Sequence, residues 1–90
     1  MNKIIITVVG HDTVGIIAKV CTYLAEHKIN ILDISQTIVQ DYFNMMMIVD
    51  TNSSDVSFEV IVDSLAAIGD EIGDMIKCQR EDIFDMMHRI

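Results

Sequence analysis

The chain has 90 residues, of which 51% are hydrophobic and 6% aromatic, and its formal net charge at pH 7 is −8. This size and composition predict one globular domain over 1–90, with the core in 1–80 and a helical tail in 81–90. The excess of acidic residues, with no stripe of lysine and arginine, argues against nucleic-acid binding.

The two cysteines, Cys21 and Cys78, lack the short spacing of a metal knuckle or a redox dithiol. We therefore expect reduced thiols, with no metal and no cofactor. The apolar runs are shorter than the ~18 residues that a membrane span requires, and the sequence from Met1 does not resemble a signal peptide. These features predict a cytoplasmic protein without a membrane segment.

The first half of the chain predicts a strand, a helix and then two further strands. β-Branched residues over 4–9 indicate a strand that is buried on both faces. A helix follows from about residue 15 to 27. Its inward-facing stripe comprises Ile17, Val20, Cys21 and Leu24. Alternating residues then predict an antiparallel hairpin, with a half-buried strand over 30–40, a turn at 41–42 and a strand over 43–50.

The second half predicts a helix, a strand and a terminal helix. A polar loop over 51–55 offers several N-caps for the helix, and Gly69 is its expected end. The apolar stripe of this helix comprises Phe58, Ile61, Val62, Leu65 and Ile68. A short strand over 75–79 and a helix over 81–89 complete the chain. The order βαββαβ predicts the α+β, ferredoxin-like class: a four-stranded antiparallel sheet with two helices on one face, plus a short C-terminal helix.

Two of the predicted strands, over 4–9 and 43–50, are apolar on both faces, whereas the two helices can cover only one face of the sheet. The other face would expose isoleucine, valine and methionine side chains, among them Ile5 and Met46, in an isolated monomer. We therefore expect a homo-oligomer, most simply a two-fold dimer.

The junction between the first strand and the first helix is a candidate binding site. Gly10, Asp12, Thr13 and Gly15 place a glycine turn and an acidic side chain beside the backbone amides of a helix N-terminus, which suits a small charged ligand. A purely structural interpretation is also open, because Asp12 or Thr13 can cap the helix and Gly15 can permit close packing on the sheet. His11 is expected to be solvated.

A longer pattern carries a family resemblance. It comprises Gly10-x-Asp12-x-x-Gly15-Ile16-x-Ala18, then Leu24-Ala25, Asn30-Ile31, Asp33-Ile34 and Gln36. At these spacings, within βαββαβ, the chain resembles the ACT domain over virtually its whole length. It is most similar to short stand-alone ACT proteins without an assigned function, and more distantly to a glycine-cleavage regulatory protein.

The resemblance implies that an amino acid or a related small ligand binds between the first loop of one subunit and the second strand of a neighbouring subunit. The ligand-binding residues carried over in this way are Gly10, His11, Asp12, Thr13, Val14, Gly15, Asn30 and Ile31. Asn30 has an alternative role as a turn residue. The loop departs from the His-x-Asn-x-x-Pro-Gly-like pattern of serine-inhibited dehydrogenases, since Gly10 stands at the His position, Asp12 at the Asn position and Val14 just before Gly15. The ligand's identity therefore does not carry over.

Three functional classes follow from these residues. The first, which we favour, is a regulatory module that binds a small molecule, acts as a homo-oligomer and signals to a partner protein. The second is a structural or protein-interaction module without a small-molecule ligand. The third, an acylphosphatase-like hydrolase, would need an arginine near the first loop, but the only arginines are Arg80 and Arg89, so no enzymatic activity is expected.

Overall fold

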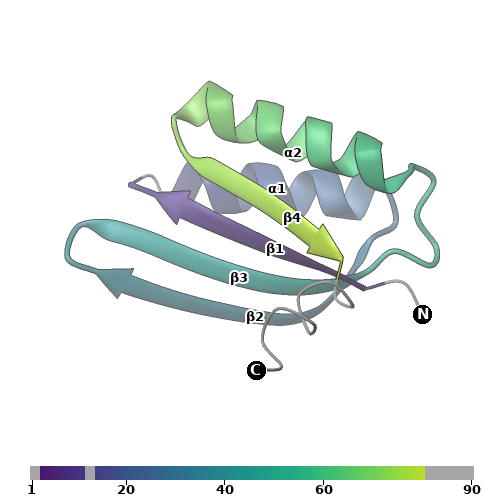
Figure 1. Ribbon diagram of the computed structural model, residues 1–90, viewed down its shortest axis with the longest axis horizontal. Coiled ribbons are helices and arrows are strands. Elements are labelled where there is room, and N and C mark those ends of the chain that lie inside the picture. Colours follow the sequence, from purple (N-terminus) through teal and green to yellow (C-terminus); the bar gives the residue numbers. More distant parts are fainter. Residues whose placement is uncertain (1–2, 12–13, 81–90) are drawn as a thin grey trace.

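The computed structural model describes residues 3–11 and 14–80, and within these ranges it contains four strands and two helices (Figure 1). In chain order they are β1 (Lys3–Gly10), α1 (Val14–Glu26), β2 (Asn30–Val39), β3 (Tyr42–Asp50), α2 (Phe58–Ile72) and β4 (Met75–Arg80). The strands form one sheet in the order β2-β3-β1-β4, with every neighbouring pair antiparallel. The predicted ferredoxin-like class is confirmed, while the predicted C-terminal helix lies outside the described residues.

Strand β1 lies between β3 and β4, and its position explains its β-branched sequence. Ile4 and Ile6 point to the helix side and Ile5 to the opposite side, yet all three are buried. The prediction of a strand buried on both faces is therefore confirmed for this segment.

One hydrophobic core joins the sheet to both helices. Directly paired residues of antiparallel strands share a face, so the pairing of Ile6 with Met47 places both on the core side. The buried members of this core are Ile4, Ile6, Val8, Ile16, Val20, Leu24, Ile29, Phe43, Met45, Met47, Val49, Ile61 and Leu65. Since residues of α1 and α2 belong to the same cluster as alternate residues of β1 and β3, both helices cover the same face of the sheet.

Helix α1 is rotated slightly from the predicted orientation. Ile16, Val20 and Leu24 are completely buried, at a spacing of four residues, whereas Ile17 and Cys21 are only partly buried. The stripe is therefore centred on Ile16 rather than on Ile17. The observed stripe and the predicted one, which includes Ile17 and Cys21, both follow the helical period. Periodicity alone therefore did not distinguish them.

Helix α2 extends one turn beyond its predicted end at Gly69. It ends at Ile72, and Gly73 follows with a left-handed φ of 92°. Gly69 is buried inside the helix because α2 packs closely against the start of β4: a Cβ at this position would lie 2.6 Å from the backbone oxygen of Asp74. The N-cap is Ser57, whose side chain accepts a hydrogen bond from the Val60 amide, rather than a residue of the loop over 51–55.

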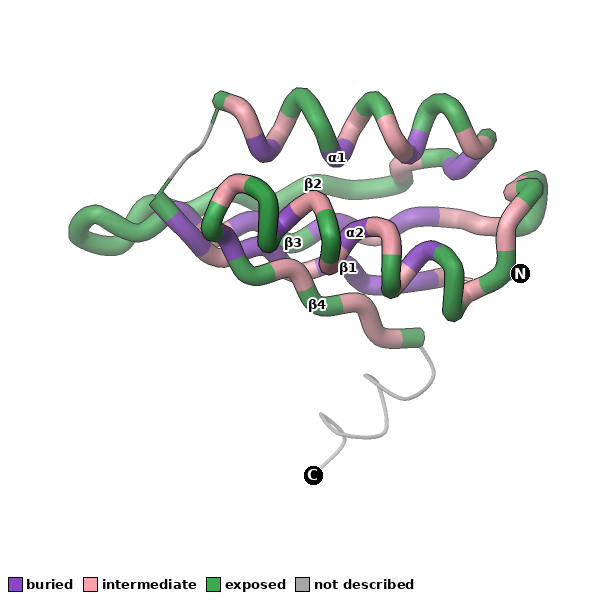
Figure 2. Tube along the Cα trace, turned by 90° about the horizontal axis from the view of Figure 1, so that it is seen from above, coloured by how far each residue is buried: buried purple, intermediate pink, exposed green. Residues whose placement is uncertain are grey.

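Strand β2 is exposed rather than half-buried. It lies at the edge of the sheet, and residues 32–39 are all exposed, as Figure 2 shows along the strand. A bulge between Ile31 and Asp33 also interrupts the predicted alternation that began at Leu32. The turn is at Gln40 and Asp41 rather than at 41–42, with Gln40 at φ 57°.

The exposed apolar surface is therefore distributed differently from the prediction. On the sheet face opposite the helices, Ile5 is buried and Met46 is 39% exposed. More apolar surface lies along the edge strand, where the exposed large side chains are Leu32, Ile34, Ile38 and Val39. Among the described residues, neither helix has the length and apolar character needed to cross a membrane.

Candidate functional site

The candidate site lies at the end of the sheet where β1 leads into α1. Gly10 is the last residue of β1 and pairs with Phe43 of β3. Val14 begins α1 with its side chain 81% exposed, and Gly15 is half-buried. Two of the predicted ligand-binding residues, Asp12 and Thr13, lie outside the described residues.

His11 connects this junction to the β2–β3 hairpin through a hydrogen bond and a ring contact. Its exposed side chain places Nδ1 3.1 Å from the carbonyl oxygen of Asp41. Because a carbonyl oxygen only accepts, Nδ1 must donate the hydrogen bond. The imidazole ring also lies against the ring of Tyr42, with a centroid distance of 4.4 Å. His11 is therefore exposed, as expected, and it contacts the turn that follows β2.

Asp74, immediately before β4, is an acidic residue that no sequence motif singled out. It is 7% exposed and is the one buried polar or charged residue in the part of the chain that the structure describes. Its backbone amide donates to the carbonyl oxygen of Gly69 at 2.9 Å, which fixes it directly after the end of α2.

The Asp74 carboxyl group lies against the backbone of Gly10. A Cβ added to Gly10 would overlap the Asp74 carboxylate and would lie 2.8 Å from Asp74 Cβ. Asp74 Oδ2 is buried and has no hydrogen-bond partner within the described structure. A buried carboxylate oxygen without a partner is costly in free energy, so it requires a specific explanation.

The sequence contained one indirect signal for this contact. The first strand of a βαββαβ domain is central and pairs with the last strand. The residue just before the last strand is therefore expected near the end of the first strand. Gly10 has no side chain and so leaves space beside the end of the first strand. Together with the strand pairing, this space pointed to Asp74 as its neighbour.

The two remaining predicted residues, Asn30 and Ile31, begin β2 at the opposite end of the sheet. Asn30 pairs with Asp50, which also pairs with Lys3, the first residue of β1. At a rise of about 3.3 Å per residue, the length of β1 separates this end from Gly10 by about 23 Å. The chain does not bring Asn30 and Gly15 together within one subunit, and the predicted site combines them only across two subunits.

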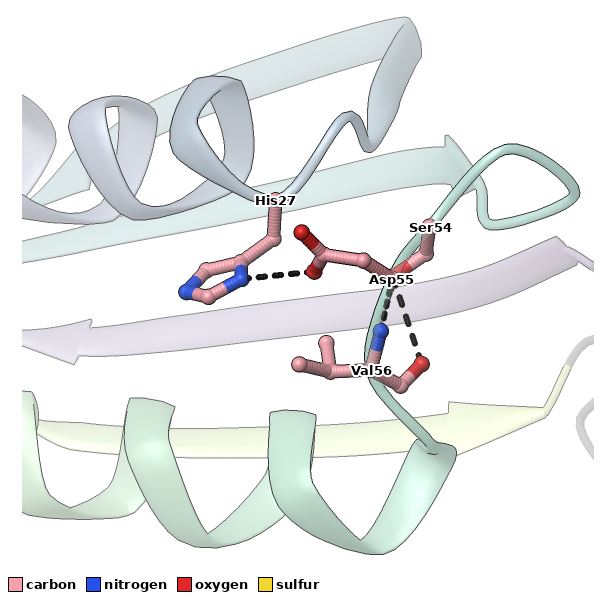
Figure 3. A network of polar contacts seen from close by, with 4 residues as sticks. All are labelled: His27, Ser54, Asp55 and Val56. Atoms are coloured by element: carbon pink, nitrogen blue, oxygen red, sulfur yellow. Dashed lines mark hydrogen bonds and ion pairs between the residues drawn. The ribbon is translucent and has the colours of Figure 1, made fainter.

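A second polar cluster ties the end of α1 to the loop before α2 (Figure 3). His27 Nδ1 lies 2.8 Å from Asp55 Oδ1, while Ser54 Oγ accepts from the Val56 amide at 3.2 Å. The ring of Tyr23 lies 4.5 Å from that of His27. This cluster joins two segments that are distant in sequence, so we interpret it as structural.

The Cys78 thiol is a further reactive side chain among the described residues. Burial raises the pKa of the Cys78 thiol to about 11, which disfavours the thiolate that acts as a nucleophile. Within the described ranges, no three histidine, cysteine, aspartate or glutamate residues are close enough together to hold a metal ion.

One cavity adjoins Asp74. It has a volume of about 350 Å³ and lies between the last turns of α2 and the start of β4. Its lining residues are Ala66, Asp70, Gly73, Asp74, Met75 and Ile76. Two acidic residues thus border a space of the size that a small molecule occupies.

Comparison with known proteins identifies the family. A family model for the ACT domain matches residues 2–78. A UPF0237 protein of Bifidobacterium longum is 64% identical over 90 residues, which cover the whole of both chains. The structure of an ACT domain protein from Streptococcus pneumoniae is 39% identical, covers 93% of this chain and 94% of that one, and superposes with a TM-score of 0.81.

A more distant likeness concerns the fold alone. A structure described as a glycine cleavage system transcriptional repressor is 22% identical, with a TM-score of 0.71, and the match covers 88% of this chain and 45% of that one. The predicted resemblance, including its more distant member, is confirmed. The chain belongs to the ACT domain family.

Proposed function

We propose that this protein is a regulatory module that binds a small molecule, most simply an amino acid, at the β1–α1 end of the sheet. The observation that carries the proposal is the contact between Gly10 and Asp74, because a buried carboxylate oxygen without a partner adjoins a position that admits no side chain. ACT domains are commonly small-molecule-binding regulatory modules, and this family membership supports the proposal.

The proposed ligand contacts combine residues of two subunits. Gly10, His11, Val14 and Gly15 belong to one subunit, together with Asp12 and Thr13, whereas Asn30 and Ile31 come from the neighbouring one. The 23 Å or so between the two ends of β1 prevents one chain from supplying both groups. A ligand held between subunits can change how they pack, and a partner protein can respond to that change.

Exposed apolar side chains support the oligomer on which this proposal depends. Ile38 is 70% exposed and Val39 is 55% exposed, on an edge strand whose outer side is unpaired within the sheet. A second strand that pairs with such an edge would cover both the apolar side chains and the backbone polar groups. The same surface also supports the second candidate, a protein-interaction module without a small-molecule ligand.

Isothermal titration with each of the twenty standard amino acids tests the proposal. We expect at least one to bind, and we expect Asn30→Ala to weaken its binding at least tenfold. Asn52→Ala, which changes an exposed residue of the loop after β3, is the matched control and should leave binding unchanged. If no amino acid produces heat or a thermal shift, amino-acid sensing is wrong and the interaction module becomes the better account.

A further inference from the structure

The buried carboxyl group of Asp74 lacks a basic partner within the described part of the chain. Lys19 forms an ion pair with Glu71 at 3.0 Å, and the guanidinium of Arg80 lies 4.8 Å from the ring centre of Phe58. Among the described residues, no basic side chain forms an ion pair with Asp74. A buried carboxylate is stabilised when a cation or several hydrogen-bond donors reach it. Binding of a positively charged group would therefore stabilise the Asp74 carboxylate.

The surroundings of Asp74 favour positive charge as well. Asp74 follows the C-terminus of α2, where the helix dipole places partial negative charge, and Asp70 in the last turn adds a second carboxylate. Both acidic residues line the cavity of about 350 Å³. The last turn of α2 carries no basic side chain that would neutralise this end.

The residues that line the cavity suit an organic cation better than a metal ion. Too few metal-ligating side chains gather in the described part of the chain to hold a metal ion, and the lining includes the apolar side chains of Ala66, Met75 and Ile76. An organic ammonium group fits this combination, because its charge can pair with a carboxylate while its carbon skeleton contacts apolar surface.

We propose that Asp74, assisted by Asp70, forms the subsite that receives the protonated primary amine of the ligand. This inference deepens the proposed function, since it rests on ligand binding at the same end of the sheet, and it defines the ligand class as primary ammonium compounds. Carboxylic acids that lack an amine are excluded from this class. Asp74 Oδ2 is shut off from water in the present conformation, so binding requires a displacement at this site, and the adjoining cavity provides unfilled volume for it.

Calorimetric titration of the full chain with paired probes tests the subsite. The probes are the twenty amino acids, methylamine as an isolated amine, and lactate and propionate as amine-free counterparts of alanine. We expect amines to bind the wild-type protein, Asp74→Asn to raise their Kd at least tenfold, and Asp70→Asn to raise it by a smaller factor. Asp63→Asn, which removes an exposed carboxylate from α2, is the matched control and should change Kd less than twofold.

The outcomes separate this inference from the proposed function. An amino acid that binds wild type and Asp74→Asn with the same Kd would overturn the inference and leave the proposed function standing. Methylamine binding that depends on Asp74, without binding of any amino acid, would support the subsite and reject amino-acid sensing. Failure of every amine to bind would overturn both. If Asp74→Asn does not fold, the ¹³C shift of the Asp74 carboxyl carbon in the wild-type protein must still change on addition of methylamine, and an unchanged shift would refute the subsite.

Discussion

At Gly10, the requirement for glycine comes from a residue 64 positions away in the sequence. The Asp74 carboxylate occupies the space into which a Cβ of residue 10 would project, and Asp74 Cβ itself would lie 2.8 Å from it. Gly10→Ala therefore forces a displacement in a buried region and should lower the free energy of unfolding by about 1–3 kcal/mol. Urea denaturation monitored by circular dichroism measures this change.

A double-mutant cycle attributes that loss to Asp74. In an Asp74→Ala background the carboxylate is gone although the Cβ remains, so Gly10→Ala should cost less than in wild type, by more than about 0.5 kcal/mol. Equal costs in both backgrounds would contradict the contact.

The Cys78 thiol gives a prediction about pH. Burial raises the pKa of Cys78 from its ordinary value of 9.0 to about 11, so the folded state holds the thiol proton more tightly than the unfolded state does. The resulting stabilisation is fully present below pH 9 and is lost as the pH rises from 9 towards 11. Urea denaturation at pH 8 and pH 10.5 should therefore show a smaller loss of stability in Cys78→Ala than in wild type. Identical losses in the two proteins would contradict the shift.

At the scale of the elements, Gly69 illustrates why the end of α2 was predicted one turn too early. A glycine that ends a helix and a glycine that permits close packing inside one look alike in sequence, and only the position of β4 distinguishes them. The edge strand shows the same limitation. Its alternating pattern predicted a buried face, but the strand order places β2 at the edge of the sheet, and its apolar side chains from Leu32 to Val39 are exposed within the subunit.

The packing role of Gly69 is open to a direct stability measurement. Replacement by alanine normally favours a helix by about 1 kcal/mol, but here the new Cβ would lie 2.6 Å from a backbone oxygen that cannot easily move. We expect Gly69→Ala to lower the free energy of unfolding by about 1–3 kcal/mol in urea denaturation. Ala67→Gly, an exposed position in the same helix, should lose only about 1 kcal/mol. A Gly69→Ala protein more stable than wild type would show that Gly69 has no packing role.

The apolar edge of β2 gives a prediction about assembly. Ile38→Glu should shift the protein towards monomer in sedimentation velocity experiments without unfolding it, because the side chain is 70% exposed in the subunit. Val60→Glu, at a 45% exposed apolar position on α2, is the control and should leave the sedimentation coefficient unchanged. If Ile38→Glu sediments as wild type does, the oligomer interface lies elsewhere.

At the scale of the whole molecule, the candidate site depends on tertiary structure more than the fold does. Local patterns were sufficient to predict all six described elements and their order. The apolar stripes of the helices and the alternation of the strands both show within a short window of sequence. The loop from Gly10 to Gly15 was likewise visible in the sequence. Asp74 could not be selected in this way. It lies buried beside Gly10 and borders the cavity next to α2, and both features arise only when distant parts of the chain fold together.

The central claim is that an amino acid binds at the β1–α1 end of one subunit and reaches the start of β2 in its neighbour. An ¹⁵N–¹H NMR titration with the amino acid that produces the largest thermal shift tests it most directly. The account predicts shifts of the Gly10, Gly15 and Asp74 amides together with that of Asn30, about 23 Å away in the same chain. The amide of Asn52 should stay unchanged. Binding that leaves Gly10 and Asp74 unshifted, or that produces shifts confined to other parts of the chain, would contradict the account.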